Sequence, residues 1–358
     1  MSMEFNDLVV TAVHKPIKEA ITVTFELPTA LQTASSYQYY AGQHLILKLH
    51  IDGTEFRRCY SLNSCPYSDA SLQITIKRVK GGVVSNYLND QLQVGDKVSV
   101  STPQGRFFAN INANAYKSYF LFAAGSGITP IISILKSVLE TSKDALVYLF
   151  YGNTDQDSII FKEELDEIAQ NYPDQVGIVY TLSAPKVWTT WETWKGKKGR
   201  IDASSVEWFI NQHPPIAQQT EYYSCGPGAM NTTVKNTLLE LGIPKELIHI
   251  EQFGATEELS NEMEGVDKAQ LTVSLDRQSH QLKMTKGKTI LETLKAAEVA
   301  SPYSCESGVC GTCVATLVKG EVVMKSCMAL DDEELKKGLI LTCRALPKTE
   351  EIEVKFER

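Results

Sequence analysis

Residues 305–313 read CESGVCGTC, and Cys343 follows Cys313 by thirty positions. Four thiolates in the order C-x4-C-x2-C with a distant fourth member are typical of a plant-type [2Fe–2S] cluster. The small residues between them let the backbone fold tightly around the inorganic core and direct N–H groups at its sulfurs, which tunes the reduction potential. The predicted cluster ligands are Cys305, Cys310, Cys313 and Cys343.

Other uses of these cysteines fit the spacing less well. A structural zinc site usually has two separated C-x2-C pairs, and a [4Fe–4S] ferredoxin shows C-x2-C-x2-C. A disulfide framework belongs to small secreted chains, whereas this chain has 358 residues and eight cysteines. We therefore favour the [2Fe–2S] interpretation.

The length suits two or three domains, and 43% hydrophobic with 22% charged residues is a globular composition. We find no run of about 20 apolar residues and no export signal at the start, so we expect a soluble cytoplasmic protein without a membrane span. A net charge of -8 argues against a nucleic-acid partner.

Residues 1–113 alternate between apolar and polar side chains, as in 45–49 and 72–76, with turn signals such as Asp52-Gly53 between the segments. This pattern predicts a small antiparallel β-barrel. Residues 114–254 instead alternate apolar strands with helical stretches, for example 119–124, then 131–139, then 145–151, then 159–169. Such alternation predicts a parallel α/β sheet.

The acidic, polar segment 255–268 suits a linker, and a C-terminal α+β domain is expected at 269–358, with a helix at 289–298. The predicted fold is therefore multidomain: an antiparallel β-barrel, a parallel-sheet α/β domain and a C-terminal α+β domain of the β-grasp type.

The barrel segment carries three features that suit a bound flavin nucleotide. Arg58 offers a guanidinium for a phosphate, Tyr60 offers a ring for a flat heterocycle, and the glycine turn before Ser85 offers a pyrophosphate site. Each feature alone also fits an exposed arginine, a core tyrosine or a hairpin. The flavin interpretation rests on the order and spacing of these three features along the chain.

The α/β segment contains Gly125-Ser126-Gly127-Ile128-Thr129-Pro130 between an apolar strand and a helix. It is an incomplete G-x-G-x-x-G motif, because its sixth residue is Pro130. Two glycines still allow close approach to a pyrophosphate, and proline suits a first helical residue. A plain strand-to-helix turn is the alternative, and Cys225-Gly226-Pro227 alone is likewise only a turn.

In this order and spacing, residues 5–254 resemble the ferredoxin–NADP reductase superfamily, and residues 269–358 resemble the plant-type ferredoxins. The first resemblance implies that Arg58 and Ser85 bind the flavin phosphates, and that Tyr60 and Ser61 contact the isoalloxazine. It also implies that the segment TPQGRF at 102–107 forms the closing strand of the barrel.

The same resemblance places Cys225-Gly226-Pro227 over the nicotinamide, so Ser61 and Cys225 are the expected catalytic residues. Phe253, at the end of Glu251-Gln252-Phe253, is expected to cover the flavin or to pack at a domain boundary. The full set of expected cofactor-binding residues is Arg58, Tyr60, Ser61, Leu62, Lys77, Val79, Gly82, Val83, Ser85, Gly125, Gly127, Thr129, Pro130, Cys225, Gly226, Pro227 and Phe253.

The choice between NADH and NADPH depends on the residues after the second strand of the α/β segment. Members of the superfamily that use NADPH often carry arginine where this chain has Thr154. The nearby Asp155 is able to accept a hydrogen bond from a ribose 2′-hydroxyl. Both residues favour NADH slightly.

A nicotinamide delivers two electrons as hydride and a [2Fe–2S] cluster accepts one at a time, so a flavin is the converter required between them. The expected flow is from NADH or NADPH through FAD to the cluster. The six histidines form no Rieske pair, and the chain has one E-x-x-H, Glu246 to His249, where a di-iron carboxylate site uses two, so oxygen chemistry is expected on a partner oxygenase.

The order of reductase followed by ferredoxin resembles the reductase components of bacterial oxygenases. The resemblance is strongest to the reductase of phenylacetyl-CoA epoxidase, a di-iron oxygenase system of phenylacetate degradation; steroid and phthalate oxygenase reductases are looser neighbours. Phthalate-type members use FMN, so FAD is an expectation from the wider family. The alternatives are a reductase of a Rieske or steroid/aromatic-ring hydroxylase, a stand-alone flavin reductase, and a monooxygenase acting on its own substrate.

Overall fold

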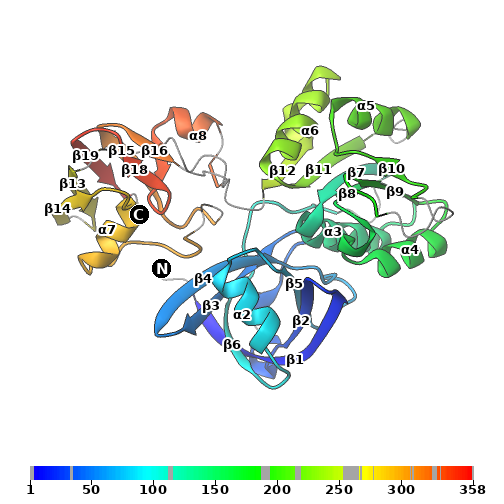
Figure 1. The fold of residues 1–358 in the computed structure, drawn as a ribbon, viewed down its shortest axis with the longest axis horizontal. Helices are drawn as coiled ribbons and strands as arrows, with labels where there is room; N and C mark the ends of the chain where they lie inside the picture. Colours follow the sequence, from blue (N-terminus) through cyan, green and yellow to red (C-terminus); the bar gives the residue numbers. More distant parts are fainter. Residues whose placement is uncertain are drawn as a thin grey trace. The chain divides into compact units, whose positions relative to one another are not determined.

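A computed structural model describes residues 4–32, 35–111, 116–186, 194–213 and 219–252, and most of the C-terminal part: 266, 268–276, 278–306, 308, 310–324, 329–330 and 332–356. These residues form two compact units (Figure 1). One comprises Phe5–Thr54 and Tyr60–Phe253, and the other is built mainly from Gly254–Arg358.

The first unit begins with an antiparallel sheet of six strands in the order β4-β3-β6-β1-β2-β5. An isolated bridge between Leu62 and Ile74 connects the end of β4 to β5 and so joins the two edges of the sheet. The strands are β1 (Phe5–Ile17), β2 (Ala20–Glu26), β3 (His44–Ile51), β4 (Thr54–Ser61), β5 (Leu72–Lys77) and β6 (Lys97–Ser101). The predicted antiparallel barrel is confirmed.

The prediction that residues 102–107 form the closing strand of the barrel is wrong. After β6 the chain leaves the sheet, and only Gln104 pairs, by a bridge to His44. Pro103 has no N–H to donate to a ladder, and Gly105 has a φ of 115°, which no regular strand adopts. Helix α2 (Val83–Gln91) packs beside β5, where the Asn89 side chain donates to the Ile76 carbonyl at 3.1 Å.

The second sheet has six strands in the order β10-β9-β8-β7-β11-β12, and every neighbouring pair is parallel. Its strands are β7 (Lys117–Ala124), β8 (Leu146–Asn153), β9 (Val176–Leu182), β10 (Lys197–Lys198), β11 (Gln219–Gly226) and β12 (Ile248–Gln252). The predicted parallel α/β arrangement is confirmed.

Helices cover both faces of this sheet, because successive residues of β7 point to opposite sides. Tyr119 and Leu121 pack toward α3 (Ile128–Thr141) and α4 (Lys162–Asn171). Phe120 and Phe122 pack toward α5 (Ala203–Gln212) and α6 (Gly228–Glu240). Figure 1 shows these two helices on the opposite side of the sheet from α3 and α4. The helix expected from residue 159 begins only at Lys162, because η3 (Gln156–Ser158) and the left-handed Phe161 precede it.

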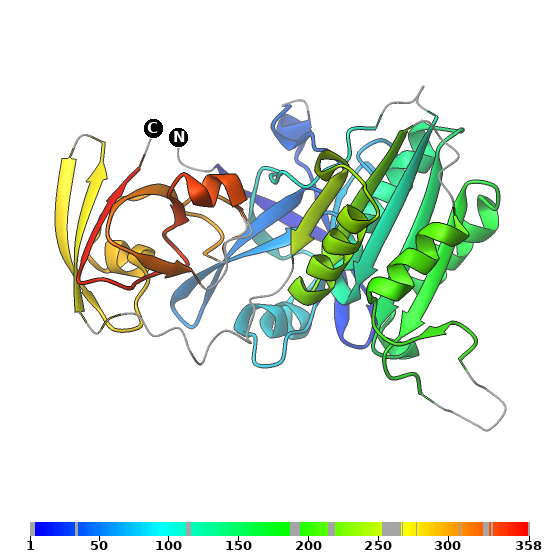
Figure 2. The ribbon, with the colours of Figure 1, turned by 90° about the horizontal axis from the view of Figure 1, so that it is seen from above.

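The second unit contains a five-stranded sheet in the order β14-β13-β19-β15-β17 and a two-stranded ribbon of β16 and β18. In Figure 2 the yellow strands β13 and β14 lie beside the red strand β19. The strands are β13 (Lys268–Leu275), β14 (Gln278–Thr285), β15 (Val314–Lys319), β16 (Val322–Met324), β17 (Leu339–Leu341), β18 (Ala345–Pro347) and β19 (Glu351–Lys355).

The predicted helix of this unit is α7 (Ile290–Ala296), which starts where Thr289 caps it. The Thr289 hydroxyl accepts from the Glu292 N–H, and the Glu292 carboxylate accepts from the Thr289 N–H, a reciprocal capping box. Ile290 and Leu294 pack into the core of the sheet. A shorter helix, α8 (Asp332–Lys336), precedes β17.

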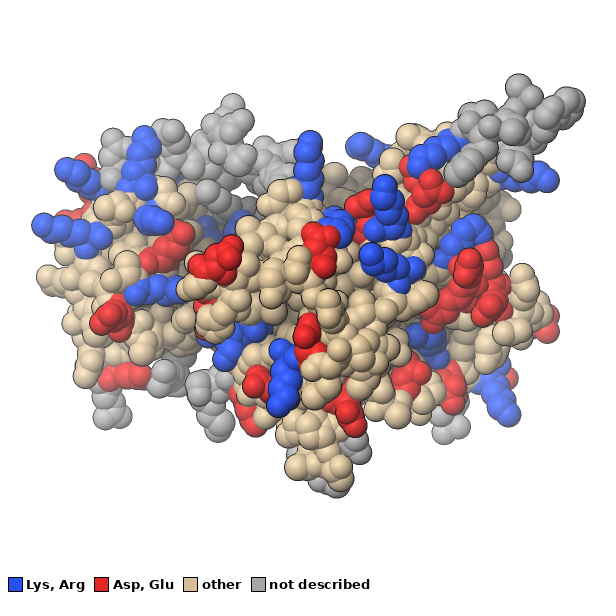
Figure 3. Space-filling view, turned by 60° about the horizontal axis from the view of Figure 1, so that its bottom comes forward, with Lys and Arg blue, Asp and Glu red and all other residues tan. Residues whose placement is uncertain are grey.

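Acidic and basic side chains are interspersed on the face drawn in Figure 3, among the residues that the structure describes. None of the described helices combines the length and the apolar character needed to cross a bilayer.

Candidate redox sites

A buried carboxylate, Glu251 on β12, lies between the two residues expected to be catalytic. The Ser61 hydroxyl, at the end of β4, donates to Glu251 Oε2 at 3.4 Å, and the Cys225 thiol on β11 lies 3.9 Å from the same oxygen. The other oxygen, Oε1, lies 3.9 Å from His44 Nδ1 on β3. Barrel and parallel sheet therefore each contribute two residues to one cluster.

Burial dominates the protonation of this cluster. Loss of solvation raises the pKa of Glu251 to about 8, although hydrogen bonds from Ser61 and Cys225 oppose the shift. Burial, and then the neighbouring carboxylate, also raise the pKa of the Cys225 thiol well above its ordinary value. At neutral pH both groups carry their protons, so Cys225 is a thiol here and no strong nucleophile.

Sequence reasoning missed Glu251 as a site residue. The segment Glu251-Gln252-Phe253 predicts a role only for Phe253, which lies outside the described residues. The register of β11 and β12 pairs Cys225 directly with Glu251, so both side chains stand on the same face of the sheet. A lone acidic residue in an apolar strand was the one signal available.

Lys77 and the glycine turn before α3 lie together at the carboxyl end of β7. The Lys77 ammonium would be 3.5 Å from a Cβ added to Gly125, and the Tyr151 hydroxyl fixes the turn by donating to the Gly125 carbonyl at 3.0 Å. Burial lowers the pKa of Lys77, and Asp155 and Glu19 partly offset this from a distance. A half-buried cation beside a glycine turn suits a dinucleotide phosphate.

Gly127 permits a close contact between the glycine turn and the end of β11. A Cβ at this position would lie 2.0 Å from the Cys225 carbonyl oxygen and 2.9 Å from the Gly226 nitrogen. Its need for glycine is therefore explained by packing of one backbone against another. Thr129 and Pro130 are buried in the first turn of α3, where the Thr129 hydroxyl donates to the Ser126 carbonyl at 3.0 Å.

We expect Gly127→Ala to lower the free energy of unfolding by about 2–4 kcal/mol, because the added methyl meets backbone that has to shift. Gly152→Ala is the matched control: its Cβ would come no closer than 3.4 Å to the Ile201 side chain, so we expect a change under about 1 kcal/mol. Urea denaturation of both variants measures the difference, and equal losses would contradict it.

The flavin-phosphate residues are arranged at the start of α2. Gly82 is its N-cap and provides no side-chain cap, so the first N–H groups of a nine-residue helix are available to an anion. The Ser85 hydroxyl accepts from the Val79 N–H at 3.1 Å and fixes this turn. Val79 and Val83 are more than half exposed beside it.

The remaining predicted cofactor-binding residues lie on or just after β4 and at the end of β11. On β4, Arg58 is half-buried and donates to the Arg57 carbonyl at 2.7 Å, and Tyr60 is also half-buried. Leu62 is fully buried in the barrel, and its N–H donates to the Gln43 carbonyl. Gly226 and Pro227 lead from β11 into α6, where Pro227 is exposed at the N-cap.

The four predicted cluster ligands come together in two pairs. The N–H of Cys310 lies 3.4 Å from the Cys305 sulfur, and the N–H of Cys305 lies 3.5 Å from the Cys310 sulfur. A hydrogen bond between the thiols of Cys313 and Cys343 raises the pKa of Cys343 and lowers that of Cys313. Two pairs of thiols fit the two irons of a [2Fe–2S] cluster.

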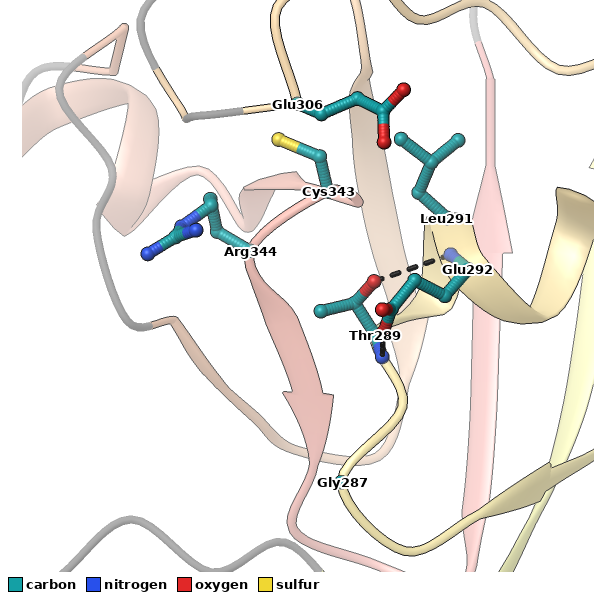
Figure 4. Close-up of a pocket in the computed structure, with 7 residues that line it drawn as sticks. All are labelled: Gly287, Thr289, Leu291, Glu292, Glu306, Cys343 and Arg344. Carbon is teal, nitrogen blue, oxygen red and sulfur yellow. Dashed lines mark hydrogen bonds between the residues drawn. The ribbon is translucent and has the colours of Figure 1, made fainter. Parts of the chain in front are cut away.

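A pocket of about 210 Å³ opens beside the fourth of these cysteines (Figure 4). Its lining brings together α7, the cysteine loop and the start of β18. The lining residues are Gly287, Thr289, Leu291, Glu292, Glu306, Cys343 and Arg344. The Glu306 carboxylate pairs with Lys295 at 2.9 Å, so the charges at this rim are partly neutralised.

A flavin-type barrel, a parallel sheet with a glycine turn and a four-cysteine domain together define a nicotinamide-dependent iron–sulfur flavoprotein. Comparisons with known proteins agree, domain by domain. Residues 8–108 match the oxidoreductase FAD-binding domain family, residues 121–236 the oxidoreductase NAD-binding domain family, and residues 273–348 the 2Fe-2S iron-sulfur cluster binding domain family.

Relatives share this organisation over nearly their whole length. The chain is 34% identical to the ferredoxin reductase component of 3-ketosteroid-9-alpha-monooxygenase from Rhodococcus rhodochrous, covering 98% of this chain and 96% of the relative. It is 32% identical to a component of 1,2-phenylacetyl-CoA epoxidase from Escherichia coli, covering 99% and 98%. The solved structure of phthalate dioxygenase reductase aligns over 98% of both chains, with a TM-score of 0.67 and 26% identity.

The chain belongs to this family of reductases, in which a ferredoxin–NADP reductase module is fused to a C-terminal plant-type ferredoxin. It is an oxidoreductase that transfers electrons from NAD(P)H through FAD to its own [2Fe–2S] cluster. The expected fold class and cofactors are confirmed.

Proposed function

We propose that this protein is the reductase component of a bacterial oxygenase system, and that its cluster delivers electrons to a separate oxygenase. The observation that carries the proposal is the Ser61–Glu251–Cys225 cluster where barrel and parallel sheet meet. It suits hydride transfer between a nicotinamide and a flavin.

The bound flavin would accept hydride and pass single electrons to the cluster. The hydride from NADH brings one proton with its two electrons, and a flavin that ends neutral after reduction would take up one more; Glu251 is a buried group that holds a proton at neutral pH. The Ser61 hydroxyl, 3.4 Å from Glu251 Oε2, would pass that proton toward the isoalloxazine. The Cys225 thiol, buried and neutral, would pack against the nicotinamide without reacting with it.

Other predicted residues would hold the flavin, the dinucleotide and the iron–sulfur cluster. The start of α2, with Gly82, Val83 and Ser85, would hold the flavin phosphates together with Arg58. Tyr60 and Leu62 would line the isoalloxazine, and Phe253 would cover it. Gly125, with Lys77, would hold the pyrophosphate of the dinucleotide. Cys305, Cys310, Cys313 and Cys343 would ligate the cluster.

For the acceptor we propose first a phenylacetyl-CoA epoxidase-type di-iron oxygenase. The identity of 32% to a 1,2-phenylacetyl-CoA epoxidase component across 99% of this chain supports it. A steroid or aromatic-ring hydroxylase is the second candidate, supported by the identity of 34% to a 3-ketosteroid-9-alpha-monooxygenase component. The reductase of glycine betaine monooxygenase from Chromohalobacter salexigens, at 31% identity, adds a third substrate class.

Anaerobic titration with NADH tests electron transfer from NADH through the flavin to the cluster. We expect bleaching of the flavin absorbance and then the low-temperature electron paramagnetic resonance signal of a reduced [2Fe–2S] cluster. Reconstitution with the oxygenase components of the three systems, each with its own substrate, tests the acceptor by product formation. A protein that contains zinc and no iron, or a cluster that NADH never reduces, would rule out the proposal.

Lys77→Gln is expected to weaken NADH binding roughly tenfold, because it removes a cation from a half-buried phosphate site. The Kd for NAD⁺ and its dependence on salt both report the loss, and the salt dependence should become shallower. Lys319→Gln, in an exposed pair with Glu351 on the ferredoxin domain, is the control and should leave Kd unchanged. Equal Kd values for both variants would contradict the assignment.

A further inference from the structure

The pocket in the C-terminal domain contains one charge that no neighbour balances. The Glu306 carboxylate pairs with Lys295 at 2.9 Å. The other carboxylate of the lining, Glu292, pairs with Lys288 at 3.8 Å. Among the residues that the structure describes, Arg344 has no ion pair and its buried Nε has no hydrogen bond. Figure 4 shows the guanidinium pointing away from both carboxylates. Counted with the two lysines, the pocket therefore has one excess positive charge.

The turn that carries Arg344 is fixed beside two predicted cluster ligands. Arg344 follows Cys343 directly, and its N–H donates to the Leu341 carbonyl at 2.9 Å. Thr342 is fully buried and bonds the Cys313 carbonyl twice, by its N–H at 3.1 Å and by its hydroxyl at 3.0 Å. Arg344 itself is half-buried, and it lines the same pocket as Cys343. Water therefore screens its charge only in part.

A positive charge at this place affects the energy of an electron on the cluster. When one electron passes from the flavin, the flavin loses it and the cluster gains it, and no bond is made or broken. The cluster becomes more negative by one charge, so a nearby cation stabilises its reduced form and raises its reduction potential. Arginine keeps its proton throughout, so the effect does not depend on titration of this side chain.

We propose that the unpaired guanidinium of Arg344 raises the reduction potential of the [2Fe–2S] cluster and so favours electron transfer from the flavin to the cluster; the inference rests on the function proposed above. Partial burial of a charge without a partner is unfavourable for the protein alone. The negative thiolates and sulfides of the bound cluster would offset that cost. The two carboxylates of the pocket do not cancel the effect, because each is paired with its own lysine.

Charge variants of Arg344 in the full-length holoprotein test this. Arg344→Gln is expected to lower the midpoint potential of the cluster, so that the equilibrium constant for electron transfer from flavin to cluster falls about tenfold, or about 59 mV for one electron. Arg344→Met is also neutral and should give the same shift, whereas Arg344→Lys keeps the charge and should stay within about twofold of wild type. The midpoint of the flavin, followed by its absorbance, should stay the same in all three. A redox titration followed by electron paramagnetic resonance gives the cluster midpoints without turnover, and iron content shows that each variant retains its cluster.

Lys319→Gln is the matched control, since it also removes a cation from the C-terminal domain. Lys319 follows Cys313 by six positions and ends β15, so at about 3.3 Å per residue it lies roughly 20 Å away, well beyond the Debye length of about 8 Å. Its cluster midpoint should match that of wild type.

Three results would overturn the inference: an Arg344→Gln midpoint equal to that of wild type, an Arg344→Lys midpoint as low as that of the glutamine variant, or loss of iron from both neutral variants, which would show a structural role instead. If NADH does not reduce the wild-type cluster, the proposed function fails. The midpoints, reached with a chemical reductant and mediators, still decide the role of Arg344.

Discussion

Replacing Cys343 with serine is expected to remove the [2Fe–2S] cluster and to lower anaerobic cytochrome c reduction on the order of a hundredfold, while the flavin is still reduced by NADH. Cys343 is buried, and its thiol pairs with that of Cys313, the third predicted ligand. The ferredoxin core around Leu271 and Val354 does not depend on this residue for its packing.

Three measurements check this expectation: iron content, the electron paramagnetic resonance signal after reduction, and the rate of ferricyanide reduction, which requires only the flavin. Cys65→Ser is the matched control, because Cys65 is also buried but lies in the reductase unit, where the Ser137 hydroxyl lies 3.4 Å from its sulfur. Cytochrome c reduction at the wild-type rate by an iron-free Cys343→Ser protein would show that the cluster is not on the path.

The cluster ligands could be predicted because three of them are close in sequence. Cys305, Cys310 and Cys313 lie within nine residues, so their spacing alone limits what they can bind. Alternation predicted both sheets of the reductase unit for a similar reason, since inward and outward residues of a strand follow each other directly. Local patterns thus predicted the fold class and the iron site.

The site around Glu251 could not be predicted in the same way. Its contact with Ser61 spans 190 positions of sequence and its contact with Cys225 spans 26. The parallel pairing of β11 with β12 brings Cys225 beside Glu251, and the contact between the end of β4 and β12 brings Ser61 to them. The role of Gly127 could not be predicted either, because the carbonyl that requires glycine at this position belongs to Cys225, which is distant in sequence.

Glu251→Gln is expected to slow flavin reduction by NADH about a hundredfold at neutral pH, because glutamine keeps the size of the side chain but holds no transferable proton. The wild-type rate should fall as pH rises through about 8, where Glu251 loses its proton. The rate of the glutamine variant should not change across that range. Stopped-flow measurements of flavin absorbance without oxygen give both profiles.

The titration of Glu251 should also affect the stability of the folded protein. The folded chain keeps the Glu251 proton up to about pH 8, whereas the unfolded chain releases it near pH 4.5. Between these values the folded state binds more protons, so the contribution of this residue to the free energy of unfolding decreases as pH rises. Glu251→Gln should therefore reduce the pH dependence of stability between about pH 4.5 and 8.

A matched control separates proton transfer from the loss of a buried acid. Glu221 lies on β11, four residues before Cys225, and its carboxylate pairs with Lys117 and accepts from the Tyr223 hydroxyl. Glu221→Gln makes the same chemical change away from Ser61, so it is expected to lower stability without changing the rate of flavin reduction per bound flavin. If Glu221→Gln and Glu251→Gln slowed the reaction equally, or if the wild-type rate were flat through pH 8, Glu251 would be only a structural residue.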